Sequence, residues 1–351
     1  MKRRTLALLI AIVTFTVGVL LAKLALPQKQ PTAPPVRHES AVSNYFLSDP
    51  FSYQNLTILL IHGPDQPNSK LFVPLQEAME SKFVVVHETS DVNELAIENL
   101  SPRDEVFVQA GDIVKGGQQD RVLAVDLIMP TRSRKAPIDA FCVEHGRWQQ
   151  RAAEPAEQFG SSAGMVATKE LKKAAKESRS QAKVWDEVDV AQRSLSRSVE
   201  TDVRSSVSRS SLQLAIENEK VTESAAVYTR KLSSIVEAKS DVLGYVFAIN
   251  GKLNSADVYA SSALFKRFWP KLLRTTAIEA VAKRPLNEKK ETVSAGAITA
   301  FFVDAERGQE STSEITERTH MIKRESEKGL FFETRDMVQA GAWVHRSYLV
   351  K

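Results

Sequence analysis

The chain has 351 residues, 43% hydrophobic and 26% charged, which is enough apolar side chain for the core of one large domain or two ordinary ones. This composition excludes a chain that is disordered throughout, a collagen-like fibre and a multi-span membrane protein, and the single cysteine excludes intrachain disulfides and zinc sites built on paired cysteines. The formal net charge of +4 suggests nucleic acid or an anionic membrane surface as a partner, until the positions of the charges are considered.

The first segment predicts a membrane anchor over residues 1–26. Lys2, Arg3 and Arg4 precede an uncharged, mostly apolar run over residues 5–22, which would span about 27 Å as a helix, close to the hydrocarbon thickness of a bilayer. The basic flank orients the amino terminus to the cytoplasm. We therefore expect a single-pass protein of the cell (inner) membrane, with its main domain periplasmic or extracellular.

A cleaved signal peptide is the alternative for this segment. Its cleavage site requires small residues at positions −3 and −1. Cleavage after Ala25 puts Lys23 at −3, and cleavage after Ala22 puts Leu20 there. This poor fit favours the uncleaved anchor, and both alternatives export the rest of the chain.

Residues 27–45 are polar and proline-rich, which predicts an extended linker between the membrane and a folded domain over residues 46–351. The anchor segment contains four basic residues and no acidic one. They account for the whole net charge, because the remaining 43 basic residues equal the 43 acidic ones in number. The folded part is therefore formally neutral, and we expect no nucleic-acid partner.

The first half of the exported part is predicted to be rich in short strands, separated by turns of Gly, Pro, Asp and Ser, with one brief helix over residues 75–79. A helical section follows over about residues 165–240, and its apolar positions, Trp185 among them, are assigned to the core. The Ser- and Arg-rich residues 194–211 are expected to be a solvated helix face or a mobile connection. The predicted strands of this half are 56–61, 83–86, 92–100, 106–108, 122–128 and 138–143.

Strand patterns return at residues 242–259, where Asn250-Gly251 between two strand-like runs predicts a hairpin. A helix over residues 263–282 follows, with Lys271 expected on a solvated face. The order of strands, helices and strands predicts an α+β fold with a mixed or antiparallel sheet. The closing strands are predicted at 298–303, 314–323, 329–333 and 343–350.

The densest polar cluster is QAGDIVKGGQQDR at residues 109–121, between two predicted strands. Its glycines allow a backbone to approach a ligand closely, and amide groups with Lys115 and Arg121 could hold an anion. The loop is neither a Walker loop nor a GxGxxG fingerprint. The alternative is a tight hairpin whose polar side chains, including Gln118 and Asp120, face water.

A second cluster, FCVEHGRW, follows at residues 141–148. Glu144 ends an apolar strand face and needs a cationic partner, Arg147 or Arg121, and Arg147 with Trp148 could stack on a planar ligand.

Cys142 could serve as a nucleophile with His145 or His87 as base, but His145 should point to the opposite strand face. An inert buried cysteine is the favoured interpretation. The six histidines show no HxH or HExxH spacing, so no metal site is expected.

In these two clusters the chain resembles the ARG-and-rhodanese-phosphatase-superfamily-associated protein domain family, where ARG stands for ADP-ribosylglycohydrolase. The resemblance is carried by AGDIVKGG with GQQDR and by FCVEHGRW, and extends more weakly over residues 50–350. It implies no established activity and no particular cofactor. The family name implies association with enzymes of ADP-ribose and phosphate chemistry.

Two functions follow from these observations. The first is a non-catalytic module that binds a small anionic ligand or a protein partner in a polar pocket between residues 109–121 and 142–148. The second is a hydrolase of a phosphorylated or ADP-ribose- or nucleotide-like compound, with Asp120 or Glu144 as general acid or base and Lys115, Arg121 and Arg147 holding the anion. The predicted binding residues are Lys115, Gln118, Asp120, Arg121, Glu144, Arg147 and Trp148.

Overall fold

The computed structural model describes residues 45–67, 69–89, 91–146, 159–284 and 293–351. The predicted anchor over residues 1–26 and the linker up to residue 44 lie outside this range, as do Arg147 and Trp148. No helix within the described ranges is both long and apolar enough to cross a membrane.

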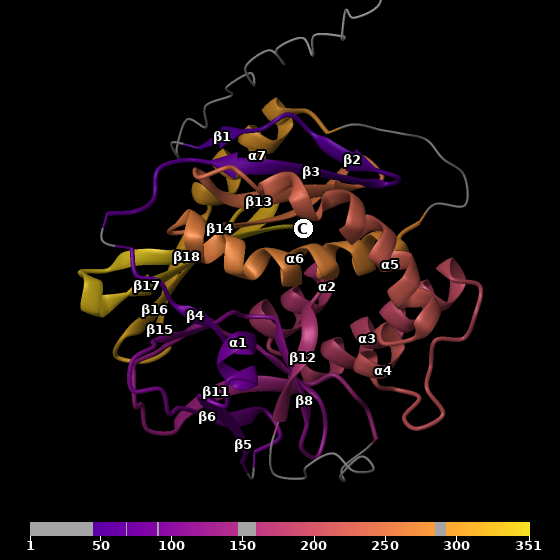
Figure 1. Cartoon of the computed structure of the whole chain (residues 1–351), viewed down its shortest axis with the longest axis horizontal. Coiled ribbons are helices and arrows are strands. Elements are labelled where there is room, and N and C mark those ends of the chain that lie inside the picture. Colours follow the sequence, from indigo (N-terminus) through magenta and orange to yellow (C-terminus); the bar gives the residue numbers. More distant parts are fainter. Residues whose placement is uncertain (1–44, 68, 90, 147–158, 285–292) are drawn as a thin grey trace, which may run out of the picture. The chain divides into compact units, whose positions relative to one another are not determined.

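The largest of the described sheets has nine strands and is antiparallel throughout (Figure 1). Its strand order is β1-β3-β13-β14-β18-β17-β16-β15, and β2 also pairs with β3. Its first and last thirds come from opposite ends of the described chain, so the carboxyl-terminal strands complete a sheet that the amino-terminal ones begin. The strands are β1 (Phe46–Leu47), β2 (Phe51–Tyr53), β3 (Leu56–His62), β13 (Val242–Ile249), β14 (Lys252–Tyr259), β15 (Gln309–Glu314), β16 (Thr319–Glu325), β17 (Gly329–Asp336) and β18 (Ala342–Val350).

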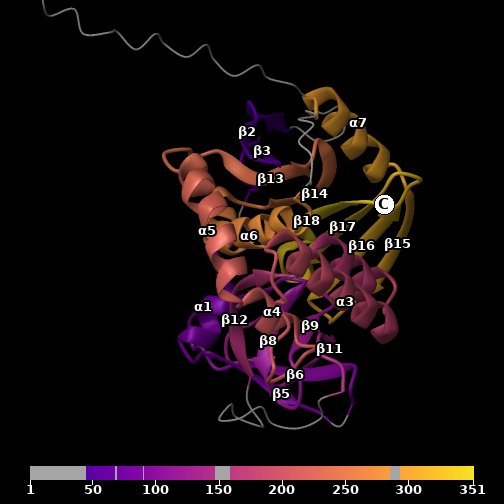
Figure 2. The ribbon, with the colours of Figure 1, turned by 90° about the vertical axis from the view of Figure 1, so that its right-hand side faces the viewer.

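The predicted hairpin is confirmed as β13 and β14. Asn250 and Gly251 both have positive φ, 54° and 72°, as a two-residue turn that matches the twist of the strands requires. All eight residues of β13 are buried, because helices cover both faces of the sheet. Helices α5 (Glu219–Leu232) and α6 (Ser262–Ala282) lie on one face and α7 (Ala295–Glu306) on the other (Figure 2).

Helix α7 corrects the predicted strand over residues 298–303. The apolar run there is short and non-alternating, so it fits a strand or a buried helix equally well. The helix begins after Ser294, whose side chain accepts a hydrogen bond from the Ala297 N–H. Ile298, Phe301 and Phe302 then pack on the outer face of the nine-stranded sheet.

A second layer lies across α6 from the large sheet, since α6 packs against both β13 and β12 (Figure 1). It contains a six-stranded sheet, β12-β8-β9-β11-β6-β5, and a three-stranded sheet, β10-β7-β4, whose β4–β7 pair is the parallel one in the described chain. These strands are β4 (Val73–Pro74), β5 (Val84–Glu88), β6 (Glu94–Asn99), β7 (Val106–Val108), β8 (Asp112–Gly116), β9 (Arg121–Leu123), β10 (Leu127–Met129), β11 (Ala136–Cys142) and β12 (Phe159–Val166).

The helical section begins after β12 and confirms the predicted α+β fold. Helix α3 continues five residues into the segment expected to be a solvated face or mobile connection, because its buried face extends to Leu195. The remaining helices are α1 (Leu75–Glu80), α2 (Lys169–Lys172), which continues as a π-helical turn (Lys173–Glu177), α3 (Gln181–Ser198), α4 (Leu212–Ile216) and the 3-10 turns Ser233–Val236 and Met337–Gln339.

Substitution of Gly244 should destabilise the large sheet. Gly244 lies at the register shift between β13 and β3, and a Cβ atom there would be 2.2 Å from the Asp257 carbonyl oxygen and 2.8 Å from the Val258 Cα. Because both neighbours are backbone, Gly244→Ala should lower the free energy of unfolding by about 3 kcal/mol, measured by urea denaturation.

Gly296→Ala on α7 is the matched control. A Cβ atom at Gly296 meets nothing within 4 Å, so this variant should be as stable as the parent or up to about 1 kcal/mol more stable, as alanine favours helix. Equal losses in the two variants would contradict this account.

Candidate functional site

The residues predicted to form a polar pocket are largely interior. Asp120, Arg121 and Glu144 are wholly buried, whereas Lys115 and Gln118 are partly exposed. The structure does bring the two sequence clusters together, because β9 pairs with β11 and the Val143 N–H donates to the Asp120 carbonyl oxygen.

The contacts of these residues fix the turn between β8 and β9. The Asp120 carboxylate accepts a hydrogen bond from the Gly116 N–H at 2.9 Å. The Arg121 guanidinium donates to the Gln119 carbonyl oxygen at 2.9 Å and lies 3.6 Å from the Glu88 carboxylate. Buried charges satisfied in this way hold a loop in shape.

Cys142 is buried, as predicted. Burial raises the pKa of its thiol and outweighs the attraction of Arg121, which disfavours the thiolate that a nucleophile requires. The His145 ring packs against Trp185 on α3. An inert cysteine fits this geometry better than a Cys–His pair.

A second cluster of charges is buried between the two layers, and sequence analysis missed it. The His345 ring on β18 lies between two carboxylates, with Nδ1 2.8 Å from Asp126 and Nε2 3.2 Å from Asp257 of β14. Lys172 and Lys176 lie 3.5 Å and 3.7 Å from Asp257 and Asp126, respectively. Because both ring nitrogens face carboxylates, only the imidazolium form of His345 satisfies both as a donor.

For most groups of this cluster, attraction between opposite charges shifts the pKa more than burial does. Burial alone would raise the pKa of Asp126 and Asp257, yet Lys176 and His345 hold the pKa of Asp126 far below its usual range. Lys172 and His345 lower the pKa of Asp257 to about 2. Burial would lower the pKa of His345, but the two carboxylates raise it. Burial does lower the pKa of Lys176, against the attraction of Asp126.

Neighbouring groups close this cluster off. Thr334 donates to the Asp126 carboxylate at 2.6 Å, and the Tyr259 and Phe107 rings contact the His345 ring with centroids 4.8 Å and 5.9 Å away. These charged side chains have almost no solvent exposure, so the cluster joins the two layers and is not open to a substrate.

Lys271 on α6 belongs to the same interior. The expectation of a solvated face is wrong for it, because its ammonium lies 2.6 Å from the Asp112 carboxylate and both side chains are buried. Asp112 is 159 positions away in the sequence, so the helical pattern around Lys271 could not reveal this partner.

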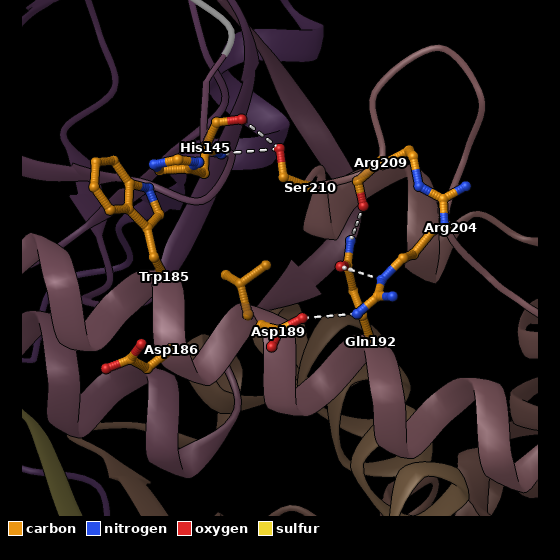
Figure 3. Close-up of a pocket in the computed structure, with 9 residues that line it drawn as sticks. His145, Trp185, Asp186, Asp189, Gln192, Arg204, Arg209 and Ser210 are labelled. Atoms are coloured by element: carbon orange, nitrogen blue, oxygen red, sulfur yellow. Dashed lines mark hydrogen bonds and ion pairs between the residues drawn. The ribbon is translucent and has the colours of Figure 1, made fainter.

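The accessible candidate site is a hollow of about 330 Å³ beside α3, which we call the α3 hollow (Figure 3). It lies between α3, the chain just after β11 and the loop over residues 199–211. The residues that matter most for its chemistry are His145, Trp185, Asp189, Gln192, Arg204 and Arg209.

Helix α3 is fixed at its start by Gln181, whose side-chain amide exchanges two hydrogen bonds of 2.8 Å with the Cys142 backbone. Val184, Val188 and Leu195 face the core. With this face buried, the helical period places Trp185, Asp189 and Gln192 along the neighbouring edge, toward the hollow.

Gln192 ties the loop to the helix. Its Nε2 donates to the carbonyl oxygens of Arg209 and Ser211 at 3.1 Å and 3.0 Å, and its Oε1 accepts from Arg204 Nε at 3.3 Å. Arg204 also donates to the Asp189 carboxylate at 2.7 Å. The walls of the hollow are therefore set by a buried amide and not by exposed side chains alone (Figure 3).

The other end of the hollow is aromatic. The His145 and Trp185 rings meet edge to face with centroids 4.5 Å apart, and Ser210 exchanges hydrogen bonds with the His145 backbone. Among the described residues, none accepts a hydrogen bond from the buried Trp185 Nε1–H. Trp185 was expected in the core, but its side chain is partly exposed. The charged neighbours Asp186 and Glu187 were the sequence signal that Trp185 lies near solvent.

The protein is an α+β domain in which two β layers pack on either side of α6. The open polar hollow beside α3 is its candidate small-molecule site. The chain belongs to the family of the ARG and Rhodanese-Phosphatase-superfamily-associated Protein domain, whose model matches residues 44–349. No curated protein and no solved structure shows significant similarity to it. Within the described ranges, no group of three His, Cys, Asp or Glu side chains is placed to hold a metal ion.

Removal of His345 should cost stability in a pH-dependent way. A histidine whose folded-state pKa is raised stabilises fully below its unfolded pKa of about 6.5, and this contribution is lost as pH rises through the folded value. His345→Gln should lower the free energy of unfolding by about 3–5 kcal/mol at pH 6, and the difference from the parent should shrink toward pH 9.

His320→Gln on β16 is the control for this experiment, because its ring is partly exposed and lies 3.9 Å from Glu314. Urea denaturation between pH 5 and pH 9 should give this variant nearly the parent's profile. A His345→Gln deficit that is constant or grows with pH would show that the histidine is not charged in the folded protein.

Proposed function

We propose that this protein is a non-catalytic ligand-binding domain that takes up a small polar molecule in the α3 hollow. The observation that carries the proposal is the combination in one hollow of an aromatic wall, His145 with Trp185, and a hydrogen-bonding floor, Asp189 with Arg204. Sites for small molecules combine apolar walls with a few fixed polar groups in this way.

The polar groups of the hollow can be taken over by a ligand at small cost. The Arg204 and Asp189 side chains are 29% and 46% exposed, and an ion pair this exposed contributes only about 0.2–1 kcal/mol to stability. A ligand that replaces the hydrogen bonds between Arg204 and Asp189 therefore costs the domain little stability. The buried Gln192 meanwhile keeps the floor in place, so the site needs little rearrangement.

The location of the domain is part of the same proposal. The apolar run over residues 5–22, with its basic flank, would hold the domain at the inner cell membrane on the periplasmic or extracellular side. The partner in solution would then be a small molecule or an exposed surface of that compartment, not nucleic acid.

The hydrolase alternative has less support from the geometry. Asp120 and Glu144, its candidate acid or base, are wholly buried. In the hollow, the Asp189 carboxylate is already paired with Arg193 and Arg204 and is not presented alone to a substrate.

A thermal-shift screen tests this function. Parent protein would be screened with phosphates, nucleotides, ADP-ribose, amino acids and sugars, with mass spectrometry of each mixture to detect turnover. We expect at least one compound to raise the melting temperature of the parent but not of Arg204→Ala, without being consumed.

Arg324→Ala is a closely matched control. Arg324 pairs with Glu310 at the same 2.7 Å distance and with nearly the same exposure, 28% and 48%, but on the β15–β16 hairpin. It should keep the parent's response to the ligand. Shifts that survive in Arg204→Ala, or no shift with any compound, would overturn the proposal, and consumption of the compound would favour the hydrolase.

A further inference from the structure

A second, more open hollow adjoins the first. It has a volume of about 560 Å³ and shares Arg204 as a wall. Its other lining residues lie on the last turns of α3 and on the loop that follows, among them Arg193, Ser196 and Arg197. Together the two hollows follow α3 from Trp185 to Arg197, which is roughly 18 Å along the helix axis, and continue onto the loop after it. We call this combined surface the α3 groove.

The charges that line the α3 groove balance. Among the described lining residues, four guanidinium groups face four carboxylates. Most are already paired with one another: Arg193 and Arg204 with Asp189, and Arg209 with Asp202. The groove therefore offers an anion no net positive field, in contrast to the small anionic ligand that the sequence suggested. The eight charged lining residues are Arg193, Arg197, Arg204, Arg209, Asp186, Asp189, Glu200 and Asp202.

Paired charges of this kind suit neighbouring hydroxyl groups. A hydroxyl both donates and accepts, so one hydroxyl of a diol can donate to the Asp189 carboxylate while the next accepts from Arg204 or Arg193. The ion pair of Asp189 with the arginines does not have to be broken for the diol to bind.

The aromatic end completes this chemistry. Trp185 is partly exposed at one end of the groove, where its ring meets the His145 ring edge to face. The exposed part of such a ring packs against the C–H face of a sugar, whose hydroxyls are left to the charged side chains further along the groove. A peptide fits less well, because Val188 is the one aliphatic side chain among the described lining residues and no strand edge borders the groove.

We propose that the α3 groove binds a short, uncharged oligosaccharide, with one sugar ring against Trp185 and the hydroxyls of the following rings on the Asp189–Arg193–Arg204 set. This inference rests on the ligand-binding function proposed above and names the class of its ligand. The length of the groove accommodates more than one ring, and its openness along α3 suits a chain that continues beyond it.

Titration calorimetry and tryptophan fluorescence test the inference. The full-length chain, in a detergent without a sugar headgroup, would be titrated with maltotetraose, cellotetraose and chitotetraose. At least one should bind and change the fluorescence of the parent, while Asp189→Asn binds it at least tenfold more weakly. Trp185→Phe, which keeps an apolar ring, should bind but lose most of the fluorescence change.

Glu310→Gln is the matched control, because it removes one carboxylate of an equally exposed ion pair elsewhere. It should bind as the parent does. Binding that is unaffected by Asp189→Asn, or no binding of any of the three sugars, overturns the oligosaccharide assignment.

Sodium diphosphate and a serine-rich peptide separate the two levels of the proposal. If either binds with dependence on Arg204 while the sugars do not, the ligand-binding function stands and the sugar assignment falls. If none of these probes binds and the thermal-shift screen is also negative, both fall.

Discussion

The buried contact of His345 with Asp126 and Asp257 is the interaction on which the arrangement of this fold depends. His345 and Asp257 belong to the nine-stranded sheet, while Asp126 follows β9 in the second layer. Charges this deeply buried are tolerated only when each has a partner, so the two layers fit together in the one arrangement that pairs them. Apolar packing around α6 holds the layers together but specifies their relative position less strictly.

The same cluster reaches the candidate site through the chain. Lys172 and Lys176, which complete the charge pairing, lie on the helical turns immediately before α3. With these turns anchored and Gln181 bonded to the end of β11, α3 has little freedom to move. The α3 hollow is thus formed by a helix fixed from its buried side, with Gln192 holding the loop on its exposed side. A rigid support of this kind is what a preformed binding site needs.

Local sequence signals predicted the elements they specify. The Asn250-Gly251 turn requires positive φ at both residues, and so the hairpin was predicted with its full bounds. The run at 298–303 carries no such signal, and its helix depends on packing against the sheet. The His345 cluster lies beyond sequence reasoning, because its carboxylates are 219 and 88 positions from the histidine. Residues 121–123 of the first polar cluster's strand do pair with residues 140–142 before the second, but burial of Asp120, Arg121 and Glu144 moves the accessible chemistry to α3.

A double-mutant cycle between Asp126 and His345 tests most directly whether these charges join the layers. Asp126→Asn, His345→Gln and the double variant would be unfolded in urea at pH 6. The account predicts that the double variant is more stable than the sum of the single losses implies, with a coupling free energy of about 2 kcal/mol or more. Additive losses would show that the two side chains do not depend on each other and would contradict the account.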